Sequence, residues 1–276
     1  MTALCLQAQP ASYLSIPNSA ERLALGGYDN ALPELQSGEL LEAGFTKTLW
    51  QTKGIDWNIS GLRATVRPLS FLAAGLEFSG NQMAEYDSYD DRGNPTGSYQ
   101  PYEMSARAEV RIYPFRSLTL SLAGRILHSS LGSNCDAQSF SADFGCSYTF
   151  SGIVTVGLQG KNIGGKLDYG SGSSLLPAIY SAGAYASIPL SQLLHLEGAL
   201  SAGSVSNYSA PFATAGAGLV IKEAVAVRLG GHFSGNTGVM PSYFSAGAFY
   251  VSRHFEIGGA YLTAANTFSI SAKLTL

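Results

Sequence analysis

The four histidines are the residues of this chain whose chemistry could be catalytic or metal-binding. His195 lies two positions before Glu197, and His232 lies four positions after Arg228, so each pair shares one face of an extended strand. A histidine beside a carboxylate can act as a general base or hold a metal ion. No nucleophile–base signature surrounds either pair, and spacing alone does not identify a triad. We therefore expect polar residues that pair across strands, and a protein that is not an enzyme and needs no cofactor or metal.

Two loop-like segments could bind ions. DSYDDRGN (Asp87–Asn94) is rich in carboxylates, but its spacing departs from the EF-hand calcium loop, which ends in Glu. GSGSS (Gly170–Ser174) is rich in glycine, but it does not join a strand to a helix as a phosphate-binding loop does. We expect both segments to be solvated loops.

Charged residues of both signs recur at every second position of several segments, such as 102–113. Unpaired charges are costly in a confined interior, so mixed signs on one face predict a network of ion pairs that closes the interior. A selective polar path is the alternative. No apolar stripe is evident on this face, which argues against a long tunnel for hydrophobic solutes. The predicted network comprises Glu77, Glu103, Arg107, Glu109, Arg111, Arg125, Asp143, Glu197, Arg228, Glu256 and Lys273.

These charges must be positioned by strands. Between residues 140 and 150, apolar and mostly aromatic residues such as Phe140 and Phe144 alternate with small polar residues and Asp143. Successive side chains of a strand point to opposite faces, so the segment has one apolar and one polar face. A soluble protein would bury the aromatic residues, whereas an outer-membrane barrel would turn them towards lipid. The polar face is mostly Ser, Thr, Gly and Ala, which suits a narrow lumen, so we predict that Phe140 and Cys146 face lipid.

Composition and connections also favour a membrane barrel. Only 13% of the residues are charged, against about 25% in ordinary globular proteins. No apolar run reaches the length of about 18 residues that a membrane-spanning helix needs. Joints between alternating segments are tight and long in turn, as are the periplasmic turns and outer loops of such barrels. We predict an all-β fold, a transmembrane antiparallel up-and-down barrel of about 14 strands over residues 39–276.

The N-terminal sequence MTALCLQAQPA resembles the end of a secretory signal peptide, and we assign residues 1–8 to its remnant. Residues 9–38 lack a regular pattern and are expected to form a periplasmic, hatch-like segment. The expected location is the outer membrane of a Gram-negative bacterium, with both termini in the periplasm. The net charge of −3 offers no basic surface for nucleic acid.

Several stretches resemble a known family. SIPNSAERLALGG (Ser15–Gly27) is similar to the segment that follows the signal peptide in FadL-type barrels, especially the PorV/PorQ branch of Bacteroidota. GNPTGSYQPYEMSARAEVRIYP (Gly93–Pro114) resembles an outer loop and the next strand of that branch, and GKNIGGKLDY at Gly160 resembles one of its strand ends. FEIGGAYLTAANTFSISAKLTL (Phe255–Leu276) fits its closing hairpin. The residues of the N-terminal motif are Pro17, Arg22, Gly26 and Gly27.

This resemblance implies a fourteen-stranded barrel and, for the PorV-like members, a part in type IX protein secretion. Family members usually follow the glycine pair with an Asp-rich segment and an NPA turn that build a luminal hatch. YDNALPELQSGELLEAGF follows Gly27 here, without that turn, so we expect a shortened hatch.

Three classes of function follow. The first is a non-enzymatic adaptor or accessory subunit of an outer-membrane protein machine, either for type IX secretion or for barrel assembly. The second is a FadL-like transporter or channel for small or hydrophobic solutes, and the third is an outer-membrane enzyme. For an adaptor, the expected partners are membrane lipid and other outer-membrane or periplasmic proteins. Tyrosines are enriched at interface hot spots, so the expected contact residues in the long loops are Tyr86, Tyr89, Tyr99 and Tyr169.

Overall fold

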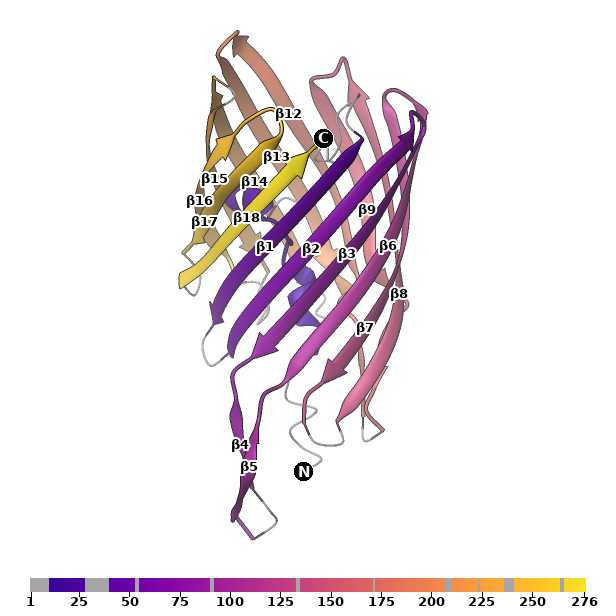
Figure 1. The fold of residues 1–276 in the computed structure, drawn as a ribbon, viewed down its shortest axis with the longest axis vertical. Helices are drawn as coiled ribbons and strands as arrows, with labels where there is room; N and C mark the ends of the chain where they lie inside the picture. Colours follow the sequence, from indigo (N-terminus) through magenta and orange to yellow (C-terminus); the bar gives the residue numbers. More distant parts are fainter. Residues whose placement is uncertain are drawn as a thin grey trace.

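In the computed structural model, the chain forms a closed β-barrel of fourteen antiparallel strands. Figure 1 shows the barrel from the side. The structure describes residues 10–27, 40–52, 55–89, 92–132, 135–170, 172–206, 210–222, 224–235, 241–263 and 266–276. The predicted signal-peptide remnant, residues 1–8, lies outside these ranges. The predicted fold class and strand number are confirmed.

The barrel strands follow one another around the wall in chain order, and the first pairs with the last. Their bounds are β1 Leu41–Thr52, β2 Ile55–Leu69, β3 Leu72–Met83, β6 Tyr102–Phe115, β7 Leu118–Ser130, β8 Asp136–Phe150, β9 Val154–Ile163, β12 Ile179–Ser191, β13 Leu194–Val205, β14 Ala210–Ile221, β15 Val225–Ser234, β16 Tyr243–Val251, β17 Phe255–Leu262 and β18 Thr267–Thr275.

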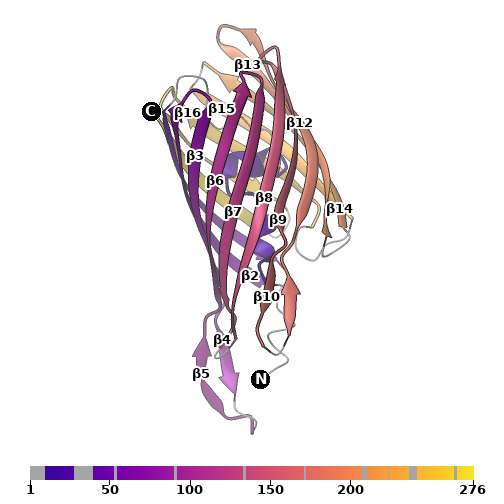
Figure 2. The same ribbon diagram turned by 90° about the vertical axis from the view of Figure 1, so that its right-hand side faces the viewer.

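The two ends of the barrel differ. Most of the tight joints lie at one end, here called the turn end, together with the C-terminal residue Leu276 near the top of Figure 1. The joint between β1 and β2 is an exception, because it is short and lies at the opposite end. The opposite end, called the loop end, carries two extra hairpins. The first pairs β4 (Tyr86–Tyr89) with β5 (Pro95–Tyr99) and projects away from the barrel, and the second pairs β10 (Lys166–Asp168) with β11 (Ser173–Leu175) (Figure 2).

Side-chain exposure follows the alternation of the strands. In β8, the exposed fractions of Phe140 and Phe144 are 65% and 49%, whereas those of Ser141 and Asp143 are 2% and 3%. Cys146 is exposed on the same outward face as the aromatic residues. Since the outward face is apolar around the barrel, the wall has the surface that a lipid bilayer requires.

Residues 10–27 lie inside the barrel. They contain the 3₁₀ helix η1 (Ser12–Ser15) and the short helix α2 (Ala20–Ala24), which contacts β15 to β18. We call residues 10–27 the luminal segment. Ala11 lies beside Glu103, near the loop end of β6, so the described chain begins at the end opposite to Leu276. The side of the membrane that each end faces stays a prediction. Neither helix of the described residues is long and apolar enough to cross a membrane.

Candidate functional site

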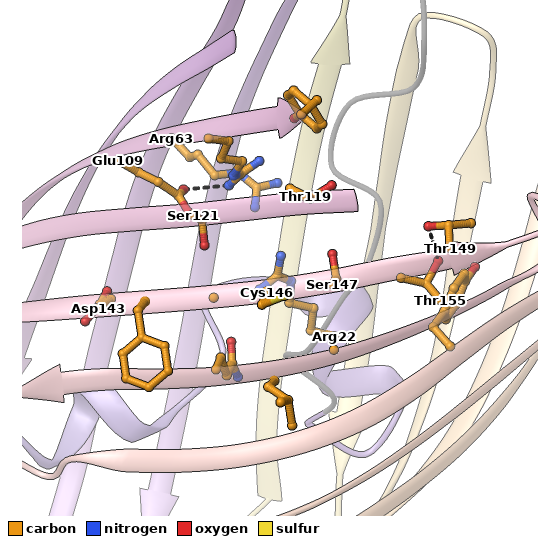
Figure 3. Close-up of a pocket in the computed structure, with 18 of the residues that line it drawn as sticks. Arg22, Arg63, Glu109, Thr119, Ser121, Asp143, Cys146, Ser147, Thr149 and Thr155 are labelled. Carbon is orange, nitrogen blue, oxygen red and sulfur yellow. Dashed lines mark hydrogen bonds and ion pairs between the residues drawn. The ribbon is translucent and has the colours of Figure 1, made fainter. Parts of the chain in front are cut away.

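The half of the lumen next to the turn end holds a polar cavity of about 1620 Å³. Hydroxyl groups from β7, β8 and β9 line one side of it, including Ser121, Ser147 and Thr155, and Arg22 of the luminal segment borders it (Figure 3). Pro17 also lines the cavity, and so does His195 at the turn end. A cavity with such walls holds water and accepts polar groups.

One cluster of ion pairs lies on the wall of this cavity. Arg107 Nε donates to Asp143 Oδ2 at 2.6 Å, and its Nη1 lies 3.1 Å from Glu109 Oε2 and 3.8 Å from Glu77 Oε2. Arg111 Nη2 lies 2.6 Å from Glu109 Oε2. Arg125, a member of the same cluster, lies 4.0 Å from Glu77 and donates to the Ser105 hydroxyl at 2.9 Å. These pairs join β3, β6, β7 and β8 across the lumen side of the wall.

A second cluster joins the luminal segment to the wall. Arg228 Nε donates to Glu197 Oε2 at 2.7 Å, and its Nη1 donates to Glu256 Oε1 at 3.0 Å. Arg228 Nη2 also lies 3.4 Å from Glu21 of α2, and Lys273 lies 3.7 Å from the same carboxylate. Because Glu21 belongs to the luminal segment, this cluster holds the segment against β15 and β18.

Glu103 stands apart from both clusters. Its Oε1 accepts hydrogen bonds from the main-chain N–H of Ala11 at 2.7 Å and from the Ser129 hydroxyl at 3.0 Å. Glu103 is only 1% exposed. The sequence predicts that Glu103 belongs to the network of ion pairs, whereas its hydrogen bonds fasten the start of the luminal segment to the loop end of the barrel.

The glycine pair of the N-terminal motif lets the luminal segment approach the wall. Gly26 and Gly27 both have φ of 80°, and the Gly27 N–H donates to the carbonyl of Arg22 at 2.9 Å, which ends α2. A Cβ on Gly26 would lie 2.5 Å from the carbonyl oxygen of Gly231, and one on Gly230 would lie 2.1 Å from the Gly26 nitrogen. Main chain therefore packs directly on main chain here, which only glycine permits.

The half of the lumen next to the loop end holds a cluster of buried apolar side chains beside Glu103 and Ser129, and we call it the apolar half. Trp50, Trp57, Leu127 and Leu262 all point inward and are at most 5% exposed, and they share a buried cluster with Tyr13 of the luminal segment. The expectation that the inner face carries no apolar stripe is therefore wrong. The sequence does not reveal the stripe, because its residues sit near strand ends on strands that are far apart along the chain.

The β10–β11 hairpin and its flanking residues fold over this apolar half. Leu167 and Leu176 are 0% and 2% exposed within the same cluster. The Tyr169 hydroxyl donates to the Ser129 hydroxyl at 2.8 Å, and burial raises the pKa of Tyr169 to about 12, which keeps it protonated. Tyr169 thus lies at the mouth of the lumen.

The other loop tyrosines lie on or next to the β4–β5 hairpin. The Tyr86 hydroxyl donates to the carbonyl of Leu131 at 2.9 Å, and the Tyr99 and Ser130 hydroxyls lie 2.6 Å apart. Both contacts fasten the hairpin to the next loop. Tyr89 is 53% exposed near the far end of the hairpin, which leaves it the loop tyrosine with the surface for a partner.

The two histidines singled out in the sequence lie at opposite ends of the lumen. His195 lies at the polar turn end. His232 is 3% exposed and stacks between the rings of Phe212 and Tyr243 at 5.6 and 5.1 Å between centroids. His232 lies opposite Thr214 and Tyr243, but its ring nitrogens make no hydrogen bond to any described residue, so the expected polar pairing is not seen there.

No family model matches the chain. No curated protein sequence matches it either. Solved structures do match across nearly the whole chain. The toluene transporter TodX of Pseudomonas putida has a TM-score of 0.63 at 10% identity, with 94% of this chain and 97% of that chain covered.

Two further structures give similar values. The toluene transporter TbuX of Ralstonia pickettii has a TM-score of 0.57 at 11% identity and covers 95% of this chain and 98% of its own. The monoaromatic hydrocarbon channel CymD has a TM-score of 0.62 at 10% identity, with 95% and 96% covered. At such identities the likeness shows the fold alone, a closed barrel of antiparallel strands. The names of these three proteins describe them as transporters or channels.

Proposed function

We propose that the protein is an outer-membrane transporter for small apolar solutes, aromatic ones in particular. The observation that carries the proposal is the inward-facing group of Trp50, Trp57, Leu127 and Leu262 at the loop end. Apolar surface of this kind takes up apolar solutes from water, because the transfer removes apolar area from contact with water. In a lumen that needed only to be closed, small polar residues and ion pairs would suffice.

The route runs from the apolar half to the polar cavity at the turn end, where a weakly soluble solute can leave into water. The luminal segment lies between the two, held by Glu21, Glu103 and the close approach of Gly26 to β15. Solute passage therefore requires this segment to shift. The names of TodX, TbuX and CymD, which refer to toluene and to monoaromatic hydrocarbons, support the same class of solute.

The proposal is tested by uptake. The barrel is expressed in a bacterial strain whose own outer-membrane hydrocarbon channels have been deleted, and the entry of radiolabelled toluene is compared with that in barrel-free cells. We expect toluene entry to rise and arabinose entry to stay unchanged. Equal toluene entry in the two strains, with the barrel inserted, rules out this function.

A second candidate is the adaptor of the PorV-like type suggested by the sequence resemblance to the Bacteroidota family. The projecting β4–β5 hairpin favours it, since the hairpin carries the exposed Tyr89 beyond the barrel. Gentle detergent pull-down from the native host tests this reading. Stoichiometric recovery of a large partner that is lost on Tyr89→Ser but kept on Tyr148→Ser, a lipid-facing control, supports the adaptor. The absence of any partner at stoichiometric level contradicts it.

A further inference from the structure

The apolar half of the lumen contains a stack of rings at the loop end. Phe212, His232 and Tyr243 stack with interplanar angles of 21° and 12°, and Trp50 meets Tyr243 edge-on at 6.2 Å between centroids. The strand register places His232 opposite Tyr243. Leu49 lies opposite Phe268, so the next positions along β1 and β18 are Trp50 and Thr267. The rings and Thr267 thus occupy neighbouring positions on one side of the lumen.

The polar atoms of this group lack partners among the described residues. Trp50 Nε1, the Tyr243 hydroxyl, the Thr267 hydroxyl and both ring nitrogens of His232 are buried and make no hydrogen bond. The exposed fractions of Trp50 and Thr267 are 0%, and those of His232 and Tyr243 are 3%. Leaving one such atom unsatisfied costs about 1–3 kcal/mol.

Four side chains of this kind in one group are unusual, since buried polar atoms are nearly always hydrogen-bonded. A site for a purely apolar solute needs no polar atoms, so Phe could stand in place of Tyr243 and His232. The group instead combines aromatic faces with an indole donor, a phenol and an imidazole, the last of which offers one donor and one acceptor when neutral. Such a set fits a planar ring that carries a small hydrogen-bonding group.

We propose that Trp50, His232, Tyr243 and Thr267 form a recognition site for aromatic solutes that bear a hydroxyl group, that is, the phenol class. This inference rests on the proposed function and narrows its solute class. The solute ring packs on the ring stack, its O–H donates to the acceptor nitrogen of His232, and its oxygen accepts from the Trp50 N–H or the Tyr243 hydroxyl. A site built to hydrogen-bond a hydroxyl discriminates against the analogue that lacks it.

The luminal segment covers this site. The main chain of Gly26 lies beside the His232 ring, and the Gly26 N–H donates to the Ser245 hydroxyl of β16 at 3.2 Å. The close approach of Gly26 to Gly230 and Gly231 places the segment on the same strand as His232. The solute and the luminal segment therefore compete for the inner face of β15 near His232. A solute can bind there only when the segment moves aside.

Tryptophan fluorescence reports on this site without an added label, because the two tryptophans of the chain are Trp50 and Trp57. The purified barrel in detergent is titrated with phenol and, separately, with toluene, and tryptophan fluorescence is recorded. We expect phenol to bind about tenfold more tightly than toluene, a difference of about 1.4 kcal/mol. His232→Phe keeps the ring and removes both nitrogens, so it should weaken phenol binding and abolish the preference. The matched control is His195→Phe at the turn end, which should leave both affinities unchanged.

The outcomes separate the two proposals. Equal affinities for phenol and toluene in the wild type, or an unchanged preference in His232→Phe, overturn the phenol-class site, because the polar atoms then bind water only. Toluene uptake would still support the transporter. Absence of binding by either compound together with absence of uptake removes the transporter as well. If His232→Phe fails to fold, Tyr243→Phe removes a single hydroxyl and should lower the phenol preference by at least about threefold.

Discussion

The main-chain N–H of Ala11 and the hydroxyl of Ser129 both donate to the same carboxylate oxygen of Glu103, at 2.7 and 3.0 Å. Ala11 lies near the start of the luminal segment, and Glu103 lies near the loop end of β6. One buried acceptor thus fastens the segment to the wall at the end where the apolar half of the lumen begins.

Replacing Glu103 by Leu should loosen the start of the luminal segment. The donors of Ala11 and Ser129 would lose their acceptor, at a cost of about 1–3 kcal/mol. Hydrogen exchange of the amides of Leu14 and Ile16, which close η1, should accelerate by about tenfold. Glu103→Gln keeps an acceptor oxygen and serves as the control. Unchanged exchange in Glu103→Leu would show that this contact does not hold the segment.

Replacing Gly230 by Val should displace the luminal segment from β15. A Cβ at this position lies 2.1 Å from the Gly26 nitrogen and 2.4 Å from the Leu25 carbonyl carbon, so main chain has to move. We expect the ion conductance of the barrel in planar bilayers to rise by at least about threefold, because mobile ions enter a widened aqueous path. Gly198→Val, with no atom within 4 Å of its Cβ, is the matched control and should conduct like the wild type. A wild-type conductance for Gly230→Val would contradict this packing.

Replacing Arg228 by Met should destabilise the barrel strongly. Arg228 is the shared partner of Glu197, Glu256 and Glu21. Its removal leaves the buried Glu197 without its cation, whereas Lys273 still lies beside Glu256 and Glu21. Loss of one partner of a buried pair costs about 3–5 kcal/mol. Urea unfolding in detergent should show this loss. Adding Glu197→Gln should restore part of it, and a double variant as unstable as the single one would argue against the pair.

Cysteine labelling should distinguish the two faces of β6. Ala106 is exposed on the outer wall, whereas Ser105 is 5% exposed and its hydroxyl lies 2.8 Å from that of Ser79. In a Cys146→Ser background, a lipid-soluble maleimide should label Ala106→Cys and spare Ser105→Cys. The reverse pattern would mean that the strand register is shifted by one residue, since such a shift exchanges the two faces.

The architecture was predictable because barrel strands carry their signal locally. Alternation along β8 and the sequence of tight and long joints were enough to predict about fourteen strands. The inward direction of the charges in β6 follows from the same periodicity. The local sequence pattern does not predict a residue's role when that role depends on residues far away in the sequence. The contact of Gly26 with Gly230 is such a case.

The aromatic part of the candidate site was missed for a related reason. Trp50 and Trp57 lie at strand ends, where alternation is short, so their inward direction depends on the exact register. His232 was expected to pair with polar groups because Arg228 shares its face. The ring stack with Phe212 and Tyr243 unites three strands, and no spacing along the chain encodes it.

The most direct test of the transporter is toluene uptake by a variant with a charge in the apolar half of the lumen. Trp50→Arg places a cation where Trp50 is 0% exposed, so apolar solutes should lose their site there. Trp50→Phe is the matched control, and heat-modifiable mobility in gels shows that each variant is inserted and folded. The account predicts that Trp50→Arg reduces the uptake rate by at least about tenfold, towards that of barrel-free cells, while Trp50→Phe stays within about twofold of the wild type. Uptake by Trp50→Arg equal to that of the wild type, at equal barrel levels, would contradict passage through the lumen.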